Sequence, residues 1–362
     1  MVKSQQKLII FVMSLVFILP AHASFFKTKI RSFVAAIKHI PPFYPPQQEI
    51  DQFHATIMKG DMQKMQSMLA SEKKLLNACT SGRTPLLTAS TAGRTHIAHF
   101  FVEKGADVTA PDSVGMTALH HFASTGDHQW CEKLLVHGAD VNARDTHDRT
   151  PVLFAAKNGA QGNPLMTACV LVKAGADVNL ADKDGNAPVG SVSLASPADA
   201  RSDASNRVMK TLVDAGANLK HANKKGEQPI HIYARMLSPK NVQTIIEQGQ
   251  KTGKIEEYVK AVDLQGGNAL HHVAQSNQYF YHPSDAQEVI ESLTKAGIGC
   301  NESDNQGQTP LHHAKALRNA TVSQVLLGAN ACPNCPDNEG KTPIDLENQW
   351  MKAQREFDTQ ED

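Results

Sequence analysis

Short helical segments arranged in pairs make up most of this chain. A typical pair begins with Thr-Pro, which suits the first turn of a helix because Thr can cap a free N–H and Pro lacks a donor that is not needed there. The second segment carries an apolar run, as in 134–136, and ends at a glycine such as Gly138, whose backbone can take the left-handed conformation that terminates helices. One pair cannot bury its apolar face alone, so the pattern predicts stacked helix–turn–helix units joined by extended loops.

The units repeat with a period near 33 residues. Eight segments share a degenerate Gly-x-Thr-Pro-Leu-His pattern, and they begin at Gly82, Gly115, Asp148, Gly185, Gly226, Gly266, Gly307 and Gly340. Successive starts are 33, 33, 37, 41, 40, 41 and 33 residues apart. A second pattern, Gly-Ala-Asp-Val-Asn or a close variant, closes most units. Two motifs recurring in phase indicate a repeat architecture, which overrides the two-domain expectation from length alone.

These segments resemble the ankyrin repeat. TPLLTA (84–89), TALHHFA (117–123), TPVLFAA (150–156) and TPLHHA (309–314) follow its first-helix motif at its 33-residue period. The resemblance covers residues 49–357 and implies an all-α fold, an ankyrin-repeat solenoid of stacked helix–turn–helix units with β-hairpin-like loops along one edge. It also implies that the hairpin tips and first helices form a concave surface for a partner protein.

The ends of the predicted ankyrin-repeat domain, residues 49–362, are atypical. Residues 49–78 lack the Thr-Pro start but have helical apolar spacing, so they are predicted to form an N-terminal cap. Repeats are expected from about residue 82, and residues 340–357 are predicted to form the C-terminal cap. Solenoids need such polar, atypical ends to stay soluble.

Departures from the period point to inserted loops. The units that begin at Asp148, Gly185 and Gly266 carry 4, 8 and 8 extra residues between their helices. In the unit that begins at Gly226 the helix pair has ordinary length up to Gly249, so its extra residues are predicted in 250–262, at the hairpin edge. This insertion is either a specificity loop or a tolerated surface insertion. Gly190 stands where His is usual, so the fourth repeat is expected to be the weakest and a place for a bend.

The first 48 residues differ from the repeats. A positive start, an apolar run at 8–19 and Ala21-His22-Ala23 form the three parts of a secretory signal peptide. Residues 1–23 are therefore predicted to be removed, and the protein to be exported from a bacterial cell, to the periplasm or beyond. Residues 24–48 contain a basic amphipathic segment and a Pro-rich spacer. Residues 25–39 either cap the first unit or make peripheral contact with an anionic membrane.

Composition narrows the classes of function. Lys+Arg and Asp+Glu both number 36, and 41% of residues are hydrophobic. The apolar content argues against a disordered chain, and the balanced charge argues against a nucleic-acid partner, because phosphate binding needs a basic surplus. No nucleotide-binding or catalytic motif appears, so the sequence predicts no enzymatic activity and no cofactor.

Cysteine and histidine supply the remaining candidate chemistry. Cys332-Pro-Asn-Cys335 has redox or metal spacing, but it lies in a hairpin without the βαβ context of a redox site. Counting back from the next unit aligns Asp337 with Asp145, whereas counting forward from Gly328 differs by two residues. Three His-His pairs, 120–121, 271–272 and 312–313, share one repeat phase. In ankyrin repeats the first of these histidines ties loops by hydrogen bonds, so no metal site is predicted.

The resemblance places the partner-binding residues on the hairpins and at the ends of the first helices. The candidates are Val114, Met116, His147, Arg149, Lys157, Asn158, Lys183, Asp184, Lys224, Lys225, Glu227, Gln306 and Gln308. The sequence thus predicts an exported monomer that binds a protein of unknown identity, as a host-directed effector or a periplasmic scaffold. Two alternatives stay open: a thiol-dependent redox or metal-binding factor using Cys332 and Cys335, and a scaffold tethered to a membrane surface through residues 25–39.

Overall fold

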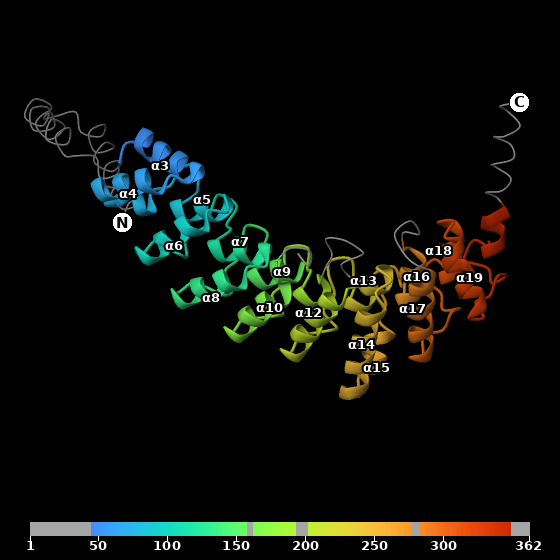
Figure 1. Ribbon diagram of the computed structural model, residues 1–362. Helices are drawn as coiled ribbons and strands as arrows, with labels where there is room; N and C mark the ends of the chain where they lie inside the picture. Colours follow the sequence, from blue (N-terminus) through green and yellow to red (C-terminus); the bar gives the residue numbers. More distant parts are fainter. Residues whose placement is uncertain (1–44, 158–161, 193–201, 277–282, 349–362) are drawn as a thin grey trace, which may run out of the picture.

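The computed structural model describes residues 45–157, 162–192, 202–276 and 283–348. Helices stack in pairs along an arc, with first helices on its inner side and second helices on its outer side (Figure 1). The described residues contain no strand, and their one isolated β-bridge joins Thr80 and Arg83. The predicted all-α solenoid is confirmed. The proposed signal peptide at 1–23 and the segment 25–39 lie outside the described residues.

The helices follow the predicted order. The segment predicted to form the N-terminal cap contains α3 (Gln47–Lys59), α4 (Met62–Ser71) and the 3₁₀-helix η1 (Lys73–Asn77). The first helices are α5 (Pro85–Thr91), α7 (Ala118–Thr125), α9 (Pro151–Lys157), the 3₁₀-helix η2 (Pro188–Gly190), α13 (Pro229–Arg235), α16 (Ala269–Ala274) and α18 (Pro310–Ala316). The second helices are α6 (Thr95–Glu103), α8 (His128–Val136), α10 (Pro164–Lys173), α12 (Asp203–Asp214), α14 (Pro239–Thr252), α17 (Pro283–Lys295) and α19 (Ala320–Gly328). One further helix, α15 (Ile255–Val259), follows α14.

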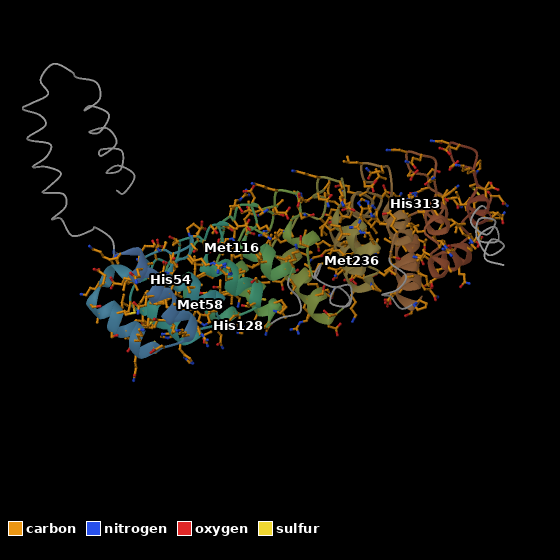
Figure 2. All side chains as sticks on the ribbon, turned by 90° about the horizontal axis from the view of Figure 1, so that it is seen from above. His54, Met58, Met116, His128, Met236 and His313 are labelled. Carbon is orange, nitrogen blue, oxygen red and sulfur yellow. A yellow bond between two sulfur atoms is a disulfide. The ribbon has the colours of Figure 1, made fainter. Side chains whose placement is uncertain are left out.

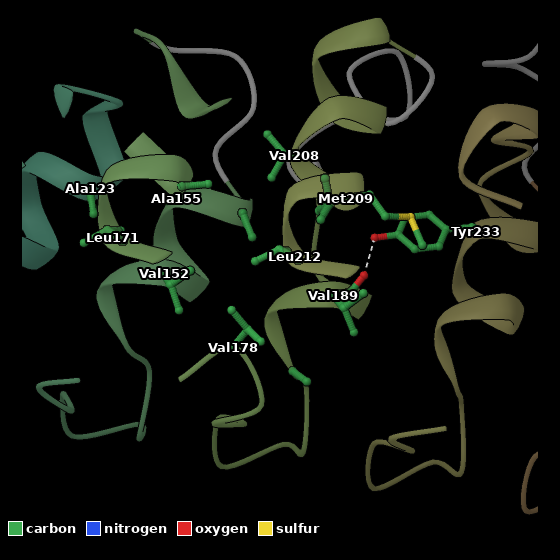
Figure 3. Packing of buried hydrophobic residues seen from close by; sticks show 14 of the residues in the cluster. Ala123, Val152, Ala155, Leu171, Val178, Val189, Val208, Met209, Leu212 and Tyr233 are labelled. Atoms are coloured by element: carbon green, nitrogen blue, oxygen red, sulfur yellow. Dashed lines mark hydrogen bonds between the residues drawn. The ribbon is translucent and has the colours of Figure 1, made fainter. Parts of the chain in front are cut away.

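A continuous hydrophobic core runs along the described part of the stack, between the two rows of helices, beside a small separate cluster of Ile232 and Met236. It extends from Ile50 to Ala331 and includes Leu171 and Leu212, both fully buried. Small side chains such as Ala155 line the close approach of neighbouring helices (Figure 3). Because each unit covers the apolar face of the next, burial of these faces stabilises the stack as a whole.

The closing motif also links neighbouring units through its asparagine. The Asn142 side chain accepts a hydrogen bond from the Asp177 N–H at 2.8 Å and donates to the Gly175 carbonyl at 3.4 Å. Asn179 and Asn301 make the equivalent pair of bonds to the units that follow them. The recurring Asn therefore fixes how the loop of each unit is aligned with the loop of the next unit.

The predicted end of the fifth unit's second helix was wrong. Gly249 does not terminate α14, which continues to Thr252 and is capped by Gly253 in the left-handed conformation, φ 68°. Gly249 instead lets the backbone of Ile255 approach closely, since a Cβ there would lie 2.8 Å from the Ile255 Cα. The remaining inserted residues form α15, which packs against α14.

The fourth repeat departs from the others at Gly190. Its first helix is reduced to the single 3₁₀ turn η2, with Gly190 at its end. The fully buried side chain of Tyr233, from α13, donates a hydrogen bond from its hydroxyl to the Val189 carbonyl at 2.6 Å (Figure 3). Tyr233 thus covers a unit that lacks the usual histidine and most of a helix.

Candidate functional site

Each hairpin from residue 112 onward is built on one side-chain turn. Oδ1 of Asp145 accepts the N–H groups of His147 and Arg149, both at 2.8 Å. The same two bonds, to the second and fourth residues onward, are made by Asp112, Asp182, Asn223, Asp263, Asp304 and Asp337. A side chain that caps its own loop in this way fixes the backbone of the tip.

Neighbouring hairpin tips are joined to one another through their backbones. The Thr146 N–H donates to the Val114 carbonyl at 2.9 Å, Lys183 to His147 at 2.9 Å, and Lys224 to Asp184 at 3.0 Å. The bonds from Asn305 to Gln265 and from Asn338 to Gln306 continue the series. We call residues 112–116, 145–149, 182–186, 223–227, 263–267, 304–308 and 337–341 the hairpin rail. Its side chains project along one edge of the stack, near Met116 and His313 (Figure 2).

The first histidine of the motif ties each unit to the next hairpin, as the resemblance implied. Nδ1 of His120 accepts the Thr117 N–H at 3.1 Å, and its Nε2 contacts the Arg149 carbonyl at 3.0 Å. His231, His271 and His312 make the same kind of bridge. Because Nδ1 accepts a backbone N–H, these rings must be neutral, with the proton on Nε2.

The second histidine has a role that the sequence did not reveal. It contacts the carboxylate of its own hairpin, with Nε2 to Oδ2 distances of 2.8 Å for His272–Asp263 and 2.8 Å for His313–Asp304. His121 lies 3.5 Å from Asp112. The nine-residue separation between hairpin Asp and second His was the available signal. These pairs hold the inner face of the first helices against the rail.

One cluster has the composition of a metal site. A ligand atom from each of His271, Asp304 and His313 lies within 4.8 Å of the other two. However, His271 already bonds at both ring nitrogens, to the Asn268 N–H at 3.1 Å and to the Gln308 carbonyl at 2.9 Å. Metal coordination by His271 would break the tie to the next hairpin that the first histidine of the motif makes in other units. Without His271 the cluster offers only two ligands, whereas zinc needs three or four that converge.

The structure places most of the candidate partner-binding residues on the rail. Val114, which is 44% exposed, and the side chains of His147, Lys183, Asp184, Lys224, Lys225 and Gln306 are exposed, as is Lys157 at the end of α9. Met116, Arg149 and Gln308 are half-buried. Asn158 lies outside the described residues. The rail therefore brings side chains from units far apart in sequence onto one edge.

Glu227 is not the exposed contact residue that the sequence predicted. It is buried, and its carboxylate pairs with Arg235 and accepts a bond from Asn223 at 2.9 Å. Burial acts to raise its pKa, but these partners outweigh burial and hold the pKa at about 2. Its charge is therefore used inside the molecule, since Arg235 at the end of α13 folds back onto it.

Arg149 is also engaged within its own unit. Its guanidinium pairs with Asp145 at 2.6 Å and lies 4.6 Å from the centre of the Phe154 ring. Its side chain remains 28% exposed, so it can still offer donors to a partner. Replacing it would disturb the hairpin as well as the surface.

Two exposed apolar residues on the rail edge were missed. Leu264 is 64% exposed and Val262 is 56% exposed, on either side of Asp263. Leu264 occupies the tip position that Lys224 has in the preceding hairpin, and its N–H donates to the Lys225 carbonyl at 3.4 Å. The hairpin spacing could have identified both residues, because Val262 directly precedes the capping residue Asp263 and Leu264 directly follows it.

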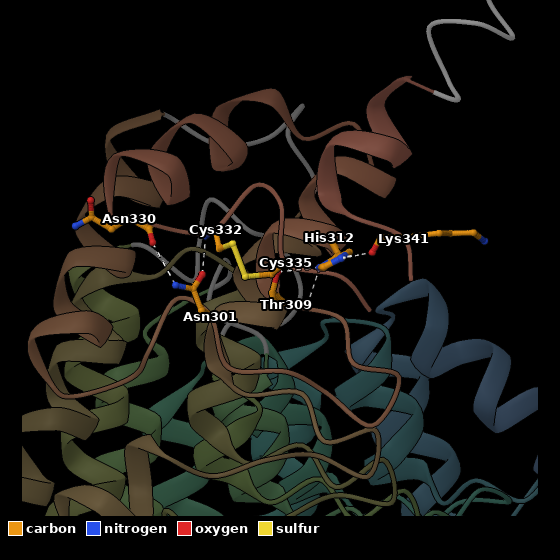
Figure 4. The surroundings of a disulfide bond; sticks show 7 residues. All are labelled: Asn301, Thr309, His312, Asn330, Cys332, Cys335 and Lys341. Carbon is orange, nitrogen blue, oxygen red and sulfur yellow. Dashed lines mark hydrogen bonds between the residues drawn. A yellow bond between two sulfur atoms is a disulfide. The ribbon is translucent and has the colours of Figure 1, made fainter. Parts of the chain in front are cut away.

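Cys332 and Cys335 form a disulfide within the last hairpin loop (Figure 4). Asn330, with φ 65°, takes the position of the closing glycine, and Asp337 caps its hairpin as Asp145 does. The backward count is thus correct. Cys332 takes the position of Asp140, whose Oδ1 accepts the Asn142 N–H at 2.9 Å. The disulfide replaces this turn by a covalent link, which gives the pair a structural role.

The other cysteines do not join this pair. Cys131 is fully buried in α8, and burial raises the pKa of its thiol to about 12. Cys300, also buried, is a free thiol. Among the described residues, no helix is both long and apolar enough to cross a membrane.

Comparison with known proteins agrees with this geometry. A family profile described as "Ankyrin repeats (3 copies)" matches residues 110–182, and one described as "Ankyrin repeat" matches residues 81–113 and 306–338. Human Inversin is 27% identical over 284 residues, covering 78% of this chain and 22% of Inversin. "Ankyrin repeat protein OPG189" of Variola virus is 28% identical over 137 residues, covering 36% of this chain and 23% of that protein.

Solved structures show the same fold. The ankyrin repeat domain of human ASB11 superposes with a TM-score of 0.53 at 23% identity, covering 69% of this chain and all of that domain. The chain spans about a fifth of the length of the curated relatives it matches first. This chain contains ankyrin repeats at 81–182 and 306–338, and its described residues have the ankyrin-repeat fold. Ankyrin repeats are protein-interaction modules, so binding to a partner protein is the function that the family supports.

Proposed function

We propose that this protein is exported and binds a partner protein through the hairpin rail and the adjoining ends of the first helices. The observation that carries this proposal is the rail itself. Side-chain caps and backbone bonds between neighbouring tips fix its backbone, while its tip side chains stay exposed. A preorganised surface loses little conformational freedom on binding, which favours affinity.

The charges of the rail suggest the chemistry of the partner. Lys183, Lys224 and Lys225 are exposed on adjacent tips, with Asp184 as the acid among them. A protein segment with acidic groups would complement this part of the rail and would be steered to it in a salt-dependent manner. Leu264, beside Lys225, offers an apolar contact at the edge of the same region.

Crosslinking tests which face binds. A photo-crosslinking residue placed at Val114 should capture a defined partner, whereas the same residue at Val136, exposed on the outer row, should not. Lys183→Glu together with Lys224→Glu should reduce recovery of that partner about tenfold or more. Lys173→Glu together with Lys210→Glu, an equal charge change on the outer helices α10 and α12, is the matched control. Capture only from position 136, or recovery unaffected by the rail reversals, would show that the binding face is wrong.

Export is tested separately. If residues 1–23 are a signal peptide, the mature chain from bacterial expression begins at Ser24, as N-terminal sequencing would show. A mature protein that keeps residues 1–23 contradicts export by cleavage. A delivered effector and a periplasmic scaffold then differ in location, inside host cells for the first and between the bacterial membranes for the second.

A further inference from the structure

The row of second helices is closed along most of the stack but open at its N-terminal end. From α8 to α19, each described second helix packs against the next. Between α4 and α6 lies a groove of about 660 Å³. It is lined by Gln66, Leu69 and Ala70 of α4, Lys73 and Leu76 of η1, and Phe100 and Lys104 of α6 and its C-cap. None of these lining residues belongs to a first helix or to the hairpin rail.

The floor of the groove is apolar. Leu69 is buried, and Leu76 and Phe100 are half-buried against the core. The volume falls within the range of about 300–1,000 Å³ in which proteins hold small molecules. An alkyl chain lying on these side chains would gain about fourfold in affinity for each methylene that it buries.

The charged groups of the groove are both cations. Lys73 and Lys104 are exposed, and the Lys104 ammonium lies 5.5 Å from the centre of the Phe100 ring. Neither lysine forms an ion pair with a described residue. The acids beside them are used elsewhere: Glu72 accepts the Lys74 N–H at 3.0 Å, and Glu103 pairs with Lys133 at 3.1 Å. The lining itself contains no carboxylate.

We propose that this groove binds a long-chain alkyl carboxylate. The chain lies on Leu69, Leu76 and Phe100, and the carboxylate faces the two ammonium groups. A cationic amphiphile would be repelled by the same lysines, and a small anion would lack the apolar contact. The site is separate from the hairpin rail, so it needs no partner protein and does not depend on the function proposed above.

Fluorescence titration of the full chain with dansyl-labelled undecanoic acid tests the site. Saturable binding that is displaced by dodecanoate, but not by acetate or dodecylammonium, is expected. Lys73→Glu together with Lys104→Glu should weaken binding about tenfold. Lys64→Glu, compared with Lys73→Glu alone, is the matched control, since this exposed lysine lies on α4 outside the groove.

A second variant tests the apolar part of the site. Ala70→Trp adds a large side chain to an exposed wall position and should abolish probe binding while the circular dichroism spectrum stays unchanged. Absence of saturable binding, equal displacement by dodecylammonium, or full binding by Ala70→Trp would overturn the proposal. Equal weakening by Lys64→Glu would also do so, because it would indicate nonspecific attraction to surface charge.

Discussion

Acid should destabilise the solenoid through its buried histidines. Burial lowers the pKa of His120, His231 and His271 below the ordinary value of 6.5. Burial, together with the nearby His231 and Arg235, lowers the pKa of His272 to about 4. The unfolded chain therefore binds protons that the folded chain does not. Stability is complete above pH 6.5 and falls as the pH drops below it.

The size of the acid-induced loss of stability can be worked out for His272. With a pKa of about 4 when folded and 6.5 when unfolded, the loss of unfolding free energy is about 2 kcal/mol at pH 5 and about 3 kcal/mol below pH 4. The lowered pKa values of His120, His231 and His271 add losses of the same sign. Glu227, whose pKa is held at about 2, adds a separate loss that begins below pH 4.5.

Urea unfolding at about pH 7.5 and pH 5, followed by circular dichroism, measures the effect. In His272→Gln, whose amide can still donate to Asp263, the acid-induced loss should shrink by about 2 kcal/mol. His96→Gln, which replaces a histidine exposed on α6, is the control for the substitution itself. If His272→Gln lost as much stability at pH 5 as the wild type, the argument from burial would be refuted.

Three further predictions concern the ties between units. Tyr233→Phe should cost about 1–3 kcal/mol in unfolding free energy, because it leaves a buried carbonyl of η2 without its donor, and a loss below 0.5 kcal/mol would contradict this. Cys332→Ser with Cys335→Ser should lower the stability of the last unit by about 2 kcal/mol, which amide hydrogen exchange would detect as faster exchange in that unit. A reducing agent should speed exchange equally in the wild type and have no effect on the variant. Asn179→Ala should cost about 1 kcal/mol in unfolding free energy, whereas Lys220→Ala, which removes an exposed ion pair, should cost less. Equal losses would show that the asparagine does not set the register.

The regular part of the fold was predictable because its ties are local or fall at fixed offsets. His120 bonds its own helix start three residues back and a hairpin 29 residues on, so one motif position carries the same role in every unit. The hairpin caps obey the same logic, because Asp145 bonds residues two and four positions ahead. Such contacts repeat with the sequence and can be read from it.

Burial on the candidate surface was harder to predict. Val114 and Glu227 both lie on the rail, yet one is exposed and the other is buried. The difference comes from Arg235, whose side chain reaches back to Glu227, and from His272 of the next unit. Since no periodic position encodes this pair, a contact list drawn from the repeat alone includes a residue that the protein uses internally.

The middle of the stack shows how lost ties are replaced. Gly190 removes a histidine tie, and Tyr233 supplies a bond to η2 across 44 residues. Lys220 stands where the closing Asn should be, and it pairs instead with Glu257 of the inserted helix α15 at 2.8 Å. The sequence reveals each loss as a mismatch to the motif, but the replacement comes from a residue outside the motif. Stability of the fourth and fifth units therefore depends on side chains that no repeat consensus would protect. Consensus substitution at Gly190 alone would not restore the standard tie, because a Cβ there would already lie 3.3 Å from the Cδ1 of Ile232. Consensus substitution at Lys220 would remove its ion pair with Glu257 of α15.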